Sequence, residues 1–300
     1  MPGLALVAAL SLNLQAESIP VPNGSFELPV TEFVEVSIES WEKTPKPDWY
    51  DESGGFYWVQ LTGLFRNEPV DHPDHIINCD GDQAIWLFAV PGVGLVQEAS
   101  PGDPGDPEGT EVLQAVFEPG KAYQLTVGVI GGGGGMLPGA TLEIGLYYRD
   151  ADGDQVTVGA TTVTHDPELF GEVKQFLDFT AHVPTVAAAD AWAGQHLGIS
   201  FMSTAGFEFQ GGFWRLDNVR LSGSSAPQLV AVAAAEGEFG FAVESQPGVS
   251  FEIFSTMDVT APFEQWISEG TVLTDESGRA EFSTNATDGV GRFYRARLVP

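Results

Sequence analysis

The feature that most constrains the fold is a series of short runs in which apolar and polar residues alternate. Residues 34–38, 123–127 and 142–146 alternate in this way, and turn-forming Gly, Pro and Asp residues separate such runs. Because successive side chains of a strand point to opposite faces, this period of two predicts strands with one buried face. Residues 84–90 form a nearly continuous apolar run, which predicts a strand covered on both faces. No window has the pattern of a long amphipathic helix, so the sequence predicts an all-β protein, a jelly-roll β-sandwich followed by a smaller β-sandwich domain.

The domain boundary is predicted where small residues and a proline gather, in the segment Ser-Gly-Ser-Ser-Ala-Pro at residues 222–227. We expect the jelly roll at residues 19–222, a linker at 223–227 and a small accessory β-sandwich at 228–300. Another glycine-rich stretch, residues 131–135, lacks the Gly-Lys-Ser/Thr of a phosphate-binding loop and is interpreted as a flexible tip.

The N-terminal segment is similar to a secretory signal. Residues 4–14 form an apolar run, and a small residue, Ala16, follows where a signal peptide would be cut. No Lys or Arg precedes the run, so a buried first strand or a misassigned start is the alternative. We expect residues 1–18 to be a whole or truncated signal peptide and the protein to be secreted or held at the cell surface, with no membrane insertion.

Charge and cysteine content exclude several classes of function. The chain has 12 Lys and Arg against 42 Asp and Glu, a net charge of −30, so nucleic acids and anionic membranes are poor partners and cations are good ones. The alternative is that the acids only keep an extracellular protein soluble. Cys79 is the single cysteine, which rules out an intrachain disulfide and a Cys-rich metal cluster.

A candidate metal site is indicated by an acid inside the β-type run at residues 213–221. By alternation Asp217 shares a face with Phe213, Val219 and Leu221, and a carboxylate on an apolar face needs a partner. The first and last strands of a sandwich domain often lie side by side, which would bring Glu27 to Asp217. Two such carboxylates repel, and a calcium ion would offset this. In the alternative reading Asp217 only caps a strand end and Asn23-Gly24 is only a turn.

Two motifs carry a family resemblance. Asn23-Gly24-Ser25-Phe26-Glu27 and Leu216-Asp217-Asn218-Val219-Arg220-Leu221 look like the opening and closing motifs of galactose-binding-like jelly rolls, and Asp80-Gly81-Asp82-Gln83-Ala84 resembles an internal segment of these domains. That group includes carbohydrate-binding modules of secreted bacterial proteins. The resemblance implies a structural Ca²⁺ held by Glu27 and Asp217, with Asn23 and Ser25 as further candidate ligands. Residues 250–298 are similar to small C-terminal β modules of secreted planctomycete and verrucomicrobial proteins.

Aromatic residues are the candidates for ligand binding, because sugar rings stack on flat aromatic faces. Trp49 and Tyr50 are adjacent in a Pro-flanked loop and form one aromatic cluster with Trp58, and residues 207–214, which include Trp214, form a second. In a sandwich such residues are more often core, so this assignment competes with a purely structural one. Asp71-His72-Pro73-Asp74-His75 gathers zinc-ligand types, but its spacing suits a loop better.

No Gly-x-Ser-x-Gly, His-Glu-x-x-His or nucleophilic-cysteine motif is present. The sequence therefore predicts a non-catalytic, secreted protein that binds carbohydrate or a cell-surface polymer and holds structural calcium. Two alternatives stay open. One is an adhesion protein that self-associates through its sandwich edges, and the other is a polysaccharide hydrolase with an unrecognised carboxylate pair.

Overall fold

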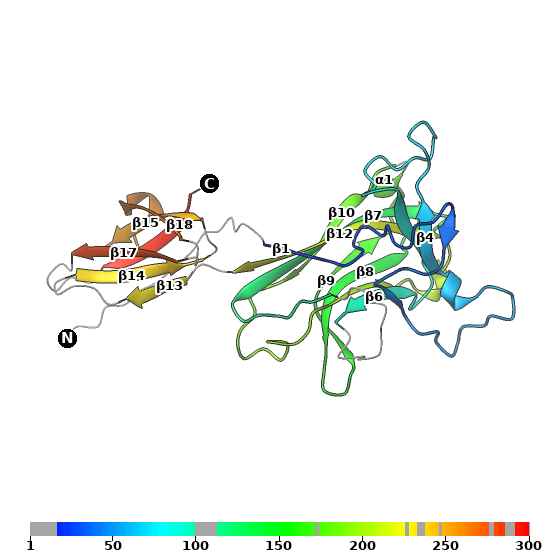
Figure 1. The fold of residues 1–300 in the computed structure, drawn as a ribbon, viewed down its shortest axis with the longest axis horizontal. Coiled ribbons are helices and arrows are strands. Elements are labelled where there is room, and N and C mark those ends of the chain that lie inside the picture. The colour runs from blue at the N-terminus through cyan, green and yellow to red at the C-terminus, as the bar shows by residue number, and fades with distance from the viewer. Residues whose placement is uncertain are drawn as a thin grey trace. The chain divides into compact units, whose positions relative to one another are not determined.

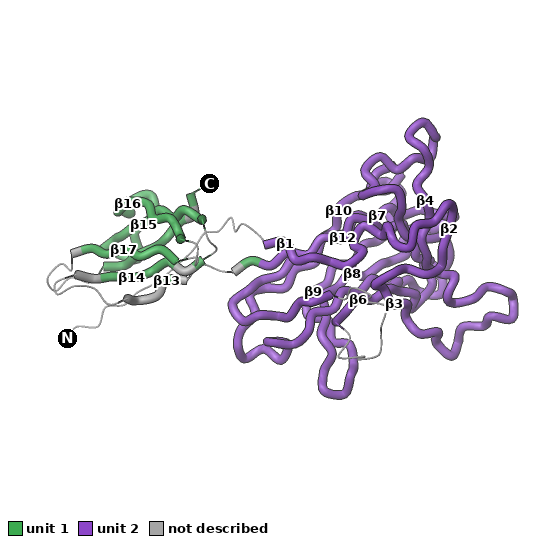
Figure 2. The backbone as a smooth tube through the Cα atoms, viewed as in Figure 1, with its two compact units in different colours: residues 1–16, 224–300 green, residues 17–223 purple. Residues whose placement is uncertain are grey.

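The structure is a computed structural model that describes residues 17–99, 113–171, 174–225, 228–232, 238–245, 248–275, 279–285 and 292–299. Residues 1–16 of the predicted signal peptide and 226–227 of the predicted linker lie outside the described residues. The chain divides into two compact units (Figure 2). The first unit is Glu17–Gly223, and the described residues of the second begin at Ser224.

The first unit is a sandwich of two antiparallel sheets (Figure 1). The seven-stranded sheet has the order β10-β7-β12-β5-β4-β2, and β1 pairs with β12. Its strands are β1 (Glu17–Ile19), β2 (Val34–Glu35), β4 (Thr62–Arg66), β5 (Gln83–Phe88), β7 (Lys121–Gly133), β10 (Leu177–Val183) and β12 (Phe213–Ser225).

The second layer of this unit is a five-stranded sheet with the order β3-β6-β11-β8-β9. Its strands are β3 (Glu42–Lys43), β6 (Gly94–Glu98), β8 (Thr141–Arg149), β9 (Gln155–Thr164) and β11 (Gly198–Ser203). Among the described residues, helix is limited to α1 (Pro167–Phe170) and the single turns η1 (Trp58–Gln60), η2 (Phe207–Phe209) and η3 (Phe263–Gln265). None of these helices is long and apolar enough to cross a membrane.

The core of the first unit lies between the two sheets and follows from the alternation in the sequence. In β8, Leu142, Ile144 and Leu146 are fully buried in this core, while the residues between them face outward. Burying each such side chain contributes about 2 kcal/mol relative to leaving it exposed. The prediction of an all-β sandwich is confirmed.

Strand β12 departs from simple alternation at one residue. Trp214 and Leu216 face the core, and so do Val219 and Leu221. Strict alternation would put Leu216 and Val219, which are three positions apart, on opposite faces. The change of parity falls at Asn218, whose φ of 55° lies in the left-handed region that Asn tolerates better than most residues. The prediction that Asp217 shares a face with Val219 and Leu221 is therefore wrong. Asp217 lies on the outer face of the sheet.

The glycine run also differs from its prediction as a flexible tip. Gly131, Gly132 and Gly133 belong to β7, next to β12 in the sheet. A Cβ atom on Gly133 would lie 2.4 Å from the ring of Phe213, and one on Gly131 would lie 2.9 Å from Trp214. Contacts this short show that positions 131 and 133 have no room for a side chain, because aromatic rings pack directly against the backbone there.

The second unit contains two three-stranded antiparallel sheets, β13-β14-β17 and β16-β15-β18. Its strands are β13 (Gln228–Val232), β14 (Glu238–Glu244), β15 (Ser250–Thr256), β16 (Ile267–Leu273), β17 (Arg279–Asn285) and β18 (Phe293–Leu298). A core of its own, which includes Phe241, Phe251, Ile253 and Tyr294, supports the predicted smaller sandwich.

Candidate functional site

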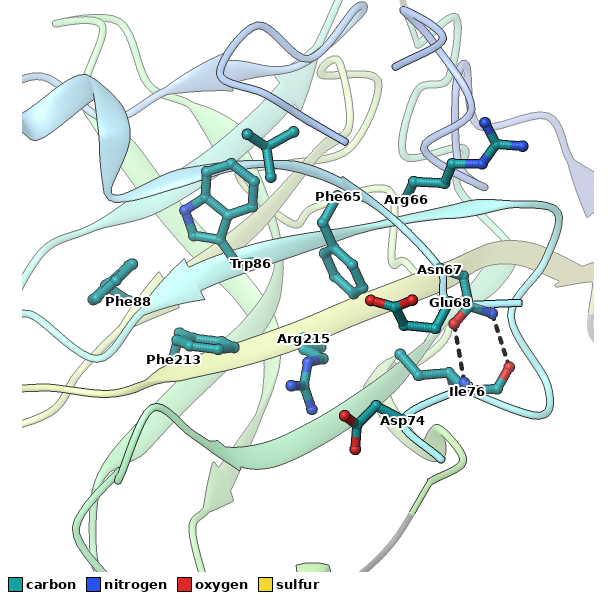
Figure 3. A pocket seen from close by; sticks show the side chains of 11 residues that line it. Phe65, Arg66, Asn67, Glu68, Asp74, Ile76, Trp86, Phe88, Phe213 and Arg215 are labelled. Carbon is teal, nitrogen blue, oxygen red and sulfur yellow. Dashed lines mark hydrogen bonds between the residues drawn. The ribbon is translucent and has the colours of Figure 1, made fainter. Parts of the chain in front are cut away.

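The outer face of the seven-stranded sheet carries a pocket of about 470 Å³ with an aromatic floor (Figure 3). The register explains how the floor forms: Gly63 of β4 lies opposite Trp86 of β5, which lies opposite Arg215 of β12. Two residues further along each strand, Phe88 lies opposite Phe213. Side chains two apart share a face, so the floor collects residues from neighbouring strands. The lining consists of Val34, Phe65, Arg66, Asn67, Glu68, Asp74, Ile76, Trp86, Phe88, Phe213 and Arg215.

Trp86 lies flat on the sheet because its cross-strand neighbour has no side chain. A Cβ atom on Gly63 would lie 2.5 Å from the Trp86 ring and 2.5 Å from the Glu35 carbonyl oxygen. The indole Nε1 donates to the Gln60 carbonyl at 3.1 Å, which fixes the ring orientation. The Trp86 ring is thus held flat as part of the pocket floor.

The loop between β4 and β5 forms the rim. Asn67 holds it closed, because its side-chain amide donates to the Ile76 carbonyl and accepts from the Ile76 N–H, both at 2.9 Å (Figure 3). This clasp brings Glu68 and Asp74 to the pocket, and Figure 3 shows their carboxylates directed toward the floor. The pocket therefore combines apolar walls with two acids.

Arg215 supplies the positive charge of the floor. Its guanidinium lies 5.3 Å from the centre of the Phe213 ring and near Asp74 (Figure 3). Burial lowers the pKa of this guanidinium, and the charge of Asp74 acts in the opposite direction. Within the described residues, Arg215 has neither a side-chain hydrogen bond nor an ion pair within 4 Å.

A second hollow of about 480 Å³ adjoins this pocket, since Asp74, Ile76 and Arg215 line both. Its floor is the backbone of residues 131–134, and Lys174 lines its edge. The two hollows form one trough across the sheet, with Arg215 at their junction.

The sequence analysis did not identify these floor residues. The available signal was local: in β5 and β12 the large residues Trp86, Phe88 and Phe213 alternate with core residues such as Leu87 and Trp214. An apolar strand with both faces occupied was predicted for residues 84–90, and this strand is β5. Which residues of different strands become neighbours depends on the register, which the sequence alone did not provide.

The aromatic residues predicted to bind a ligand lie elsewhere. Trp58 is 4% exposed and Trp214 is fully buried, so neither can present a ring face to a ligand. Trp49 is 45% exposed and lines a separate hollow beside Phe207. Tyr50 is half-buried and packs on the core, with its ring 5.0 Å from that of Trp58. For Trp58 and Trp214 the structural alternative is correct.

The two acids of the predicted calcium site meet at one turn. Glu27 Oε1 accepts the N–H groups of Asp82 and Gln83 at 2.9 and 2.7 Å. Asp217 Oδ2 accepts the Asp80 N–H at 2.7 Å. Both carboxylates therefore bind the segment Asp80–Gln83 that enters β5, although Glu27 and Asp217 lie far apart in the sequence.

Asp217 is fully buried without a compensating cation. Burial raises its pKa to about 7, and hydrogen bonds from the backbone of Asp80 and Asn218 counteract this only in part. No described Lys or Arg lies within 4 Å of Asp217 or Glu27. The Asp217 charge and burial also raise the pKa of the neighbouring Cys79 thiol, burial contributing most. A buried carboxylate beside a second acid suits a hard cation with oxygen ligands.

The other predicted metal ligands have different surroundings. The Asn23 side chain donates to the Leu28 and Glu39 carbonyls, both at 2.8 Å, and accepts the Leu28 N–H at 3.0 Å. Asn23 thus organises the loop after it, as the turn alternative expected. Ser25 is half-buried in the same turn. Among the described residues, no group of three or more His, Cys, Asp or Glu side chains is placed to hold a metal, His72 and His75 included.

The fold is similar to several solved structures. A cyclase from Fischerella sp. TAU is 21% identical, with a TM-score of 0.48 over 71% of this chain and 100% of that one. A Stig cyclase, Fisc, from Fischerella sp. TAU, solved in complex with (3Z)-3-(1-methyl-2-pyrrolidinylidene)-3H-indole, is 21% identical, with a TM-score of 0.47 over 70% and 99%. A family 22 carbohydrate-binding module of Clostridium thermocellum Xyn10B is 12% identical, with a TM-score of 0.31 over 65% and 92%. The search of curated proteins found no match.

A family model decides between these likenesses. The model of the HpiC1-like family, described as HpiC1 cyclase, matches residues 17–222. Because this is a family of enzymes, the prediction of a non-catalytic protein with a carbohydrate or surface-polymer partner is wrong, and so are the adhesion and hydrolase alternatives. The match spans more than half of the chain and coincides with the sandwich that carries the pocket, and the chain therefore belongs to the HpiC1-like family.

Proposed function

We propose that the chain is a cyclase that closes a ring within a small, largely apolar molecule bound in the aromatic pocket. The observation that carries this proposal is a pocket of about 470 Å³, within the size range of small-molecule sites, inside the segment that matches the cyclase family. A flat aromatic floor suits a planar, unsaturated molecule.

The floor would contribute by holding a flexible substrate in a folded conformation. Ring closure joins two parts of one molecule, and fixing them in contact removes much of the entropic barrier. Trp86 and Phe65 offer flat surfaces on neighbouring strands, and Phe88 and Phe213 extend them. Such walls also keep water away from a reactive unsaturated intermediate.

Glu68 is the proposed proton donor. Its carboxyl group points toward the floor, whereas Asp74 is electrostatically coupled to Arg215 and serves to orient the guanidinium. Glu68 would give its proton to the unsaturated substrate, the new carbon–carbon bond would form, and a proton lost from the cyclised product would return to the Glu68 carboxylate. Substrate and product are then isomers.

The test uses aromatic compounds with an unsaturated side chain, indoles among them, incubated with the purified full chain. Chromatography with mass and NMR detection should find a product of unchanged mass with one more ring. Glu68→Gln should lower turnover by roughly 100-fold or more. Glu118→Gln makes the same charge change at a side chain that is 52% exposed and pairs with Lys121 away from the pocket, and it should leave turnover unchanged. Absence of any isomeric product across the panel would refute the proposal.

We also propose that calcium binds between Glu27 and Asp217 as a structural ion. Two acids at one turn without a Lys or Arg partner support this assignment, and backbone oxygens would complete the shell. Bound calcium supplies positive charge that ties the start of the domain to β12. Chelation should lower Tm and added calcium should restore it, while Asp217→Asn should remove the response. An equal Tm with chelator and with calcium would count against the site.

A further inference from the structure

We propose that the molecules this pocket selects carry a carboxylate, which the Arg215 guanidinium binds while the apolar body of the molecule lies on the aromatic floor. This names the substrate class of the site and so rests on the proposed function.

A guanidinium presents five N–H donors in a planar fork and does not lose its charge in a protein. Arg215 is half-buried on the pocket floor, and within the described residues no acceptor lies within hydrogen-bond distance of its side chain. Its position is fixed from one side by the Phe213 ring, 5.3 Å away. Its donors are therefore available in the pocket, and a hydrogen bond to a charged group contributes more than one between neutral groups.

The distribution of charge supports an anionic group. Only 12 of 300 residues are Lys or Arg, yet Arg66, Lys174 and Arg215 all line the trough. Two of them are engaged: Arg66 pairs with Glu32 at 2.8 Å, and Lys174 donates to the Pro73 carbonyl. Of the three, Arg215 is the one for which the described residues supply no hydrogen-bond acceptor, so all of its donors are open to a ligand.

The acid nearest to Arg215 does not occupy it. Asp74 acts on the guanidinium through its charge, but no ion pair within 4 Å joins the two. Asp74 therefore keeps the guanidinium charged and oriented, and the planar fork still has an edge to offer. A carboxylate matches that edge with two parallel hydrogen bonds.

The shape of the trough indicates where the carboxylate of the ligand would lie relative to the rest of the ligand. Arg215 lines both hollows, so a carboxylate bound to it would sit at their junction. The apolar body would then extend over Phe65, Trp86 and Phe88. The glycine-floored hollow leaves space around the carboxylate.

The experiment compares 2-naphthoate with 2-naphthamide, which have the same planar body and shape but differ in charge. Binding of each to the full chain is measured by calorimetry or naphthyl fluorescence at pH 7. The wild-type protein should prefer naphthoate by roughly 10-fold or more, because a charge-assisted bidentate pair replaces a neutral hydrogen bond. Arg215→Gln should abolish the preference while still binding naphthamide, and Arg215→Lys should keep part of it.

Arg220→Gln is the matched control. Arg220 lies on the same strand, pairs with Asp178 and does not line the trough, so this variant changes the net charge equally and should keep the preference. Equal binding of the two probes to the wild type, or an undiminished preference in Arg215→Gln, would overturn the inference. If Arg215→Gln does not fold, Arg215→Lys decides: it should show a smaller preference than the wild type, and an undiminished preference would overturn the inference. If the protein closes rings but shows no preference for naphthoate, the proposed function stands and this inference fails. If it prefers naphthoate but closes no ring, this inference stands and the proposed function fails.

Discussion

The two outer faces of the first sandwich use the same packing device and differ in how they treat charge. On the five-stranded sheet the Tyr147 ring lies over Gly198 of the next strand, where a Cβ atom would be 2.4 Å away. Arg149 lies near that ring, and its Nε donates to both carboxylate oxygens of Glu98, at 2.8 and 3.0 Å. On the seven-stranded sheet Trp86 lies over Gly63 in the same way.

The two faces differ in the partner of the arginine that lies beside each ring. Arg149 is paired with an acid on its own sheet, and it lines the hollow of about 720 Å³ that also contains Trp49 and Phe207. Arg215 is the cross-strand neighbour of Trp86 and has no such acid within 4 Å, and the face opens into a pocket. Asp217, two residues further along the same face, is likewise buried without a cation. The two faces therefore both carry a hollow and differ in whether the arginine beside the ring has an acid partner.

The largest expected effect concerns Asp217 and pH. Its folded-state pKa of about 7 lies above the usual 3.8, so between these values the folded protein holds a proton that the unfolded chain has released. The free energy of unfolding should therefore fall as pH rises through that window, by on the order of a few kcal/mol in calcium-free buffer. Denaturant unfolding at pH 4.5 and 7.5 measures this, and Asp217→Asn should flatten the profile.

The control for this prediction is Asp178→Asn, an exposed acid paired with Arg220. It should leave the pH profile of the wild type in place. A profile that Asp217→Asn does not change would mean that Asp217 is ionised without penalty, and the contrast between matched and unmatched charges would fail.

The next effect concerns the two glycines under the aromatic rings. Gly63→Ala and Gly198→Ala should each lower the free energy of unfolding by roughly 1–3 kcal/mol, because the new methyl group overlaps a packed ring. Only Gly63→Ala should also weaken naphthamide binding, since Trp86 forms the pocket and Tyr147 does not. Chemical denaturation and ligand titration separate the two outcomes. Equal binding losses in both variants would show that the faces do not differ in function.

The smallest effect separates the two arginines by stability. Arg149→Gln should cost about 0.5 kcal/mol, because the pair with Glu98 is partly exposed and solvent weakens it. Arg215→Gln should cost no more than this, since it breaks no hydrogen bond or ion pair among the described residues. Urea unfolding of both variants checks this order. A markedly larger loss for Arg215→Gln would mean that the residue is structural.

The sequence predicted the architecture well and the site poorly, for a physical reason. Strand period and turn residues are local properties, so the sandwich followed from short motifs. The pocket depends on the register of β4, β5 and β12, which brings together Phe65, Trp86 and Arg215 from distant parts of the chain. Burial of Trp214 was also undecidable locally, because both faces of β12 carry large residues.

The left-handed residue at position 218 has a consequence for how this chain can diverge. Because the backbone reverses its facing there, the part of β12 before it presents residues to the trough and the part after it closes the sandwich beside β1. Substitutions at positions 213 and 215 can therefore change the lining of the trough without disturbing residues 219–223, which close the sandwich and pair with β1. An insertion or deletion of one residue at this joint would turn Val219 and Leu221 out of the interior, so relatives should vary in side chains before position 218 and conserve the spacing across it.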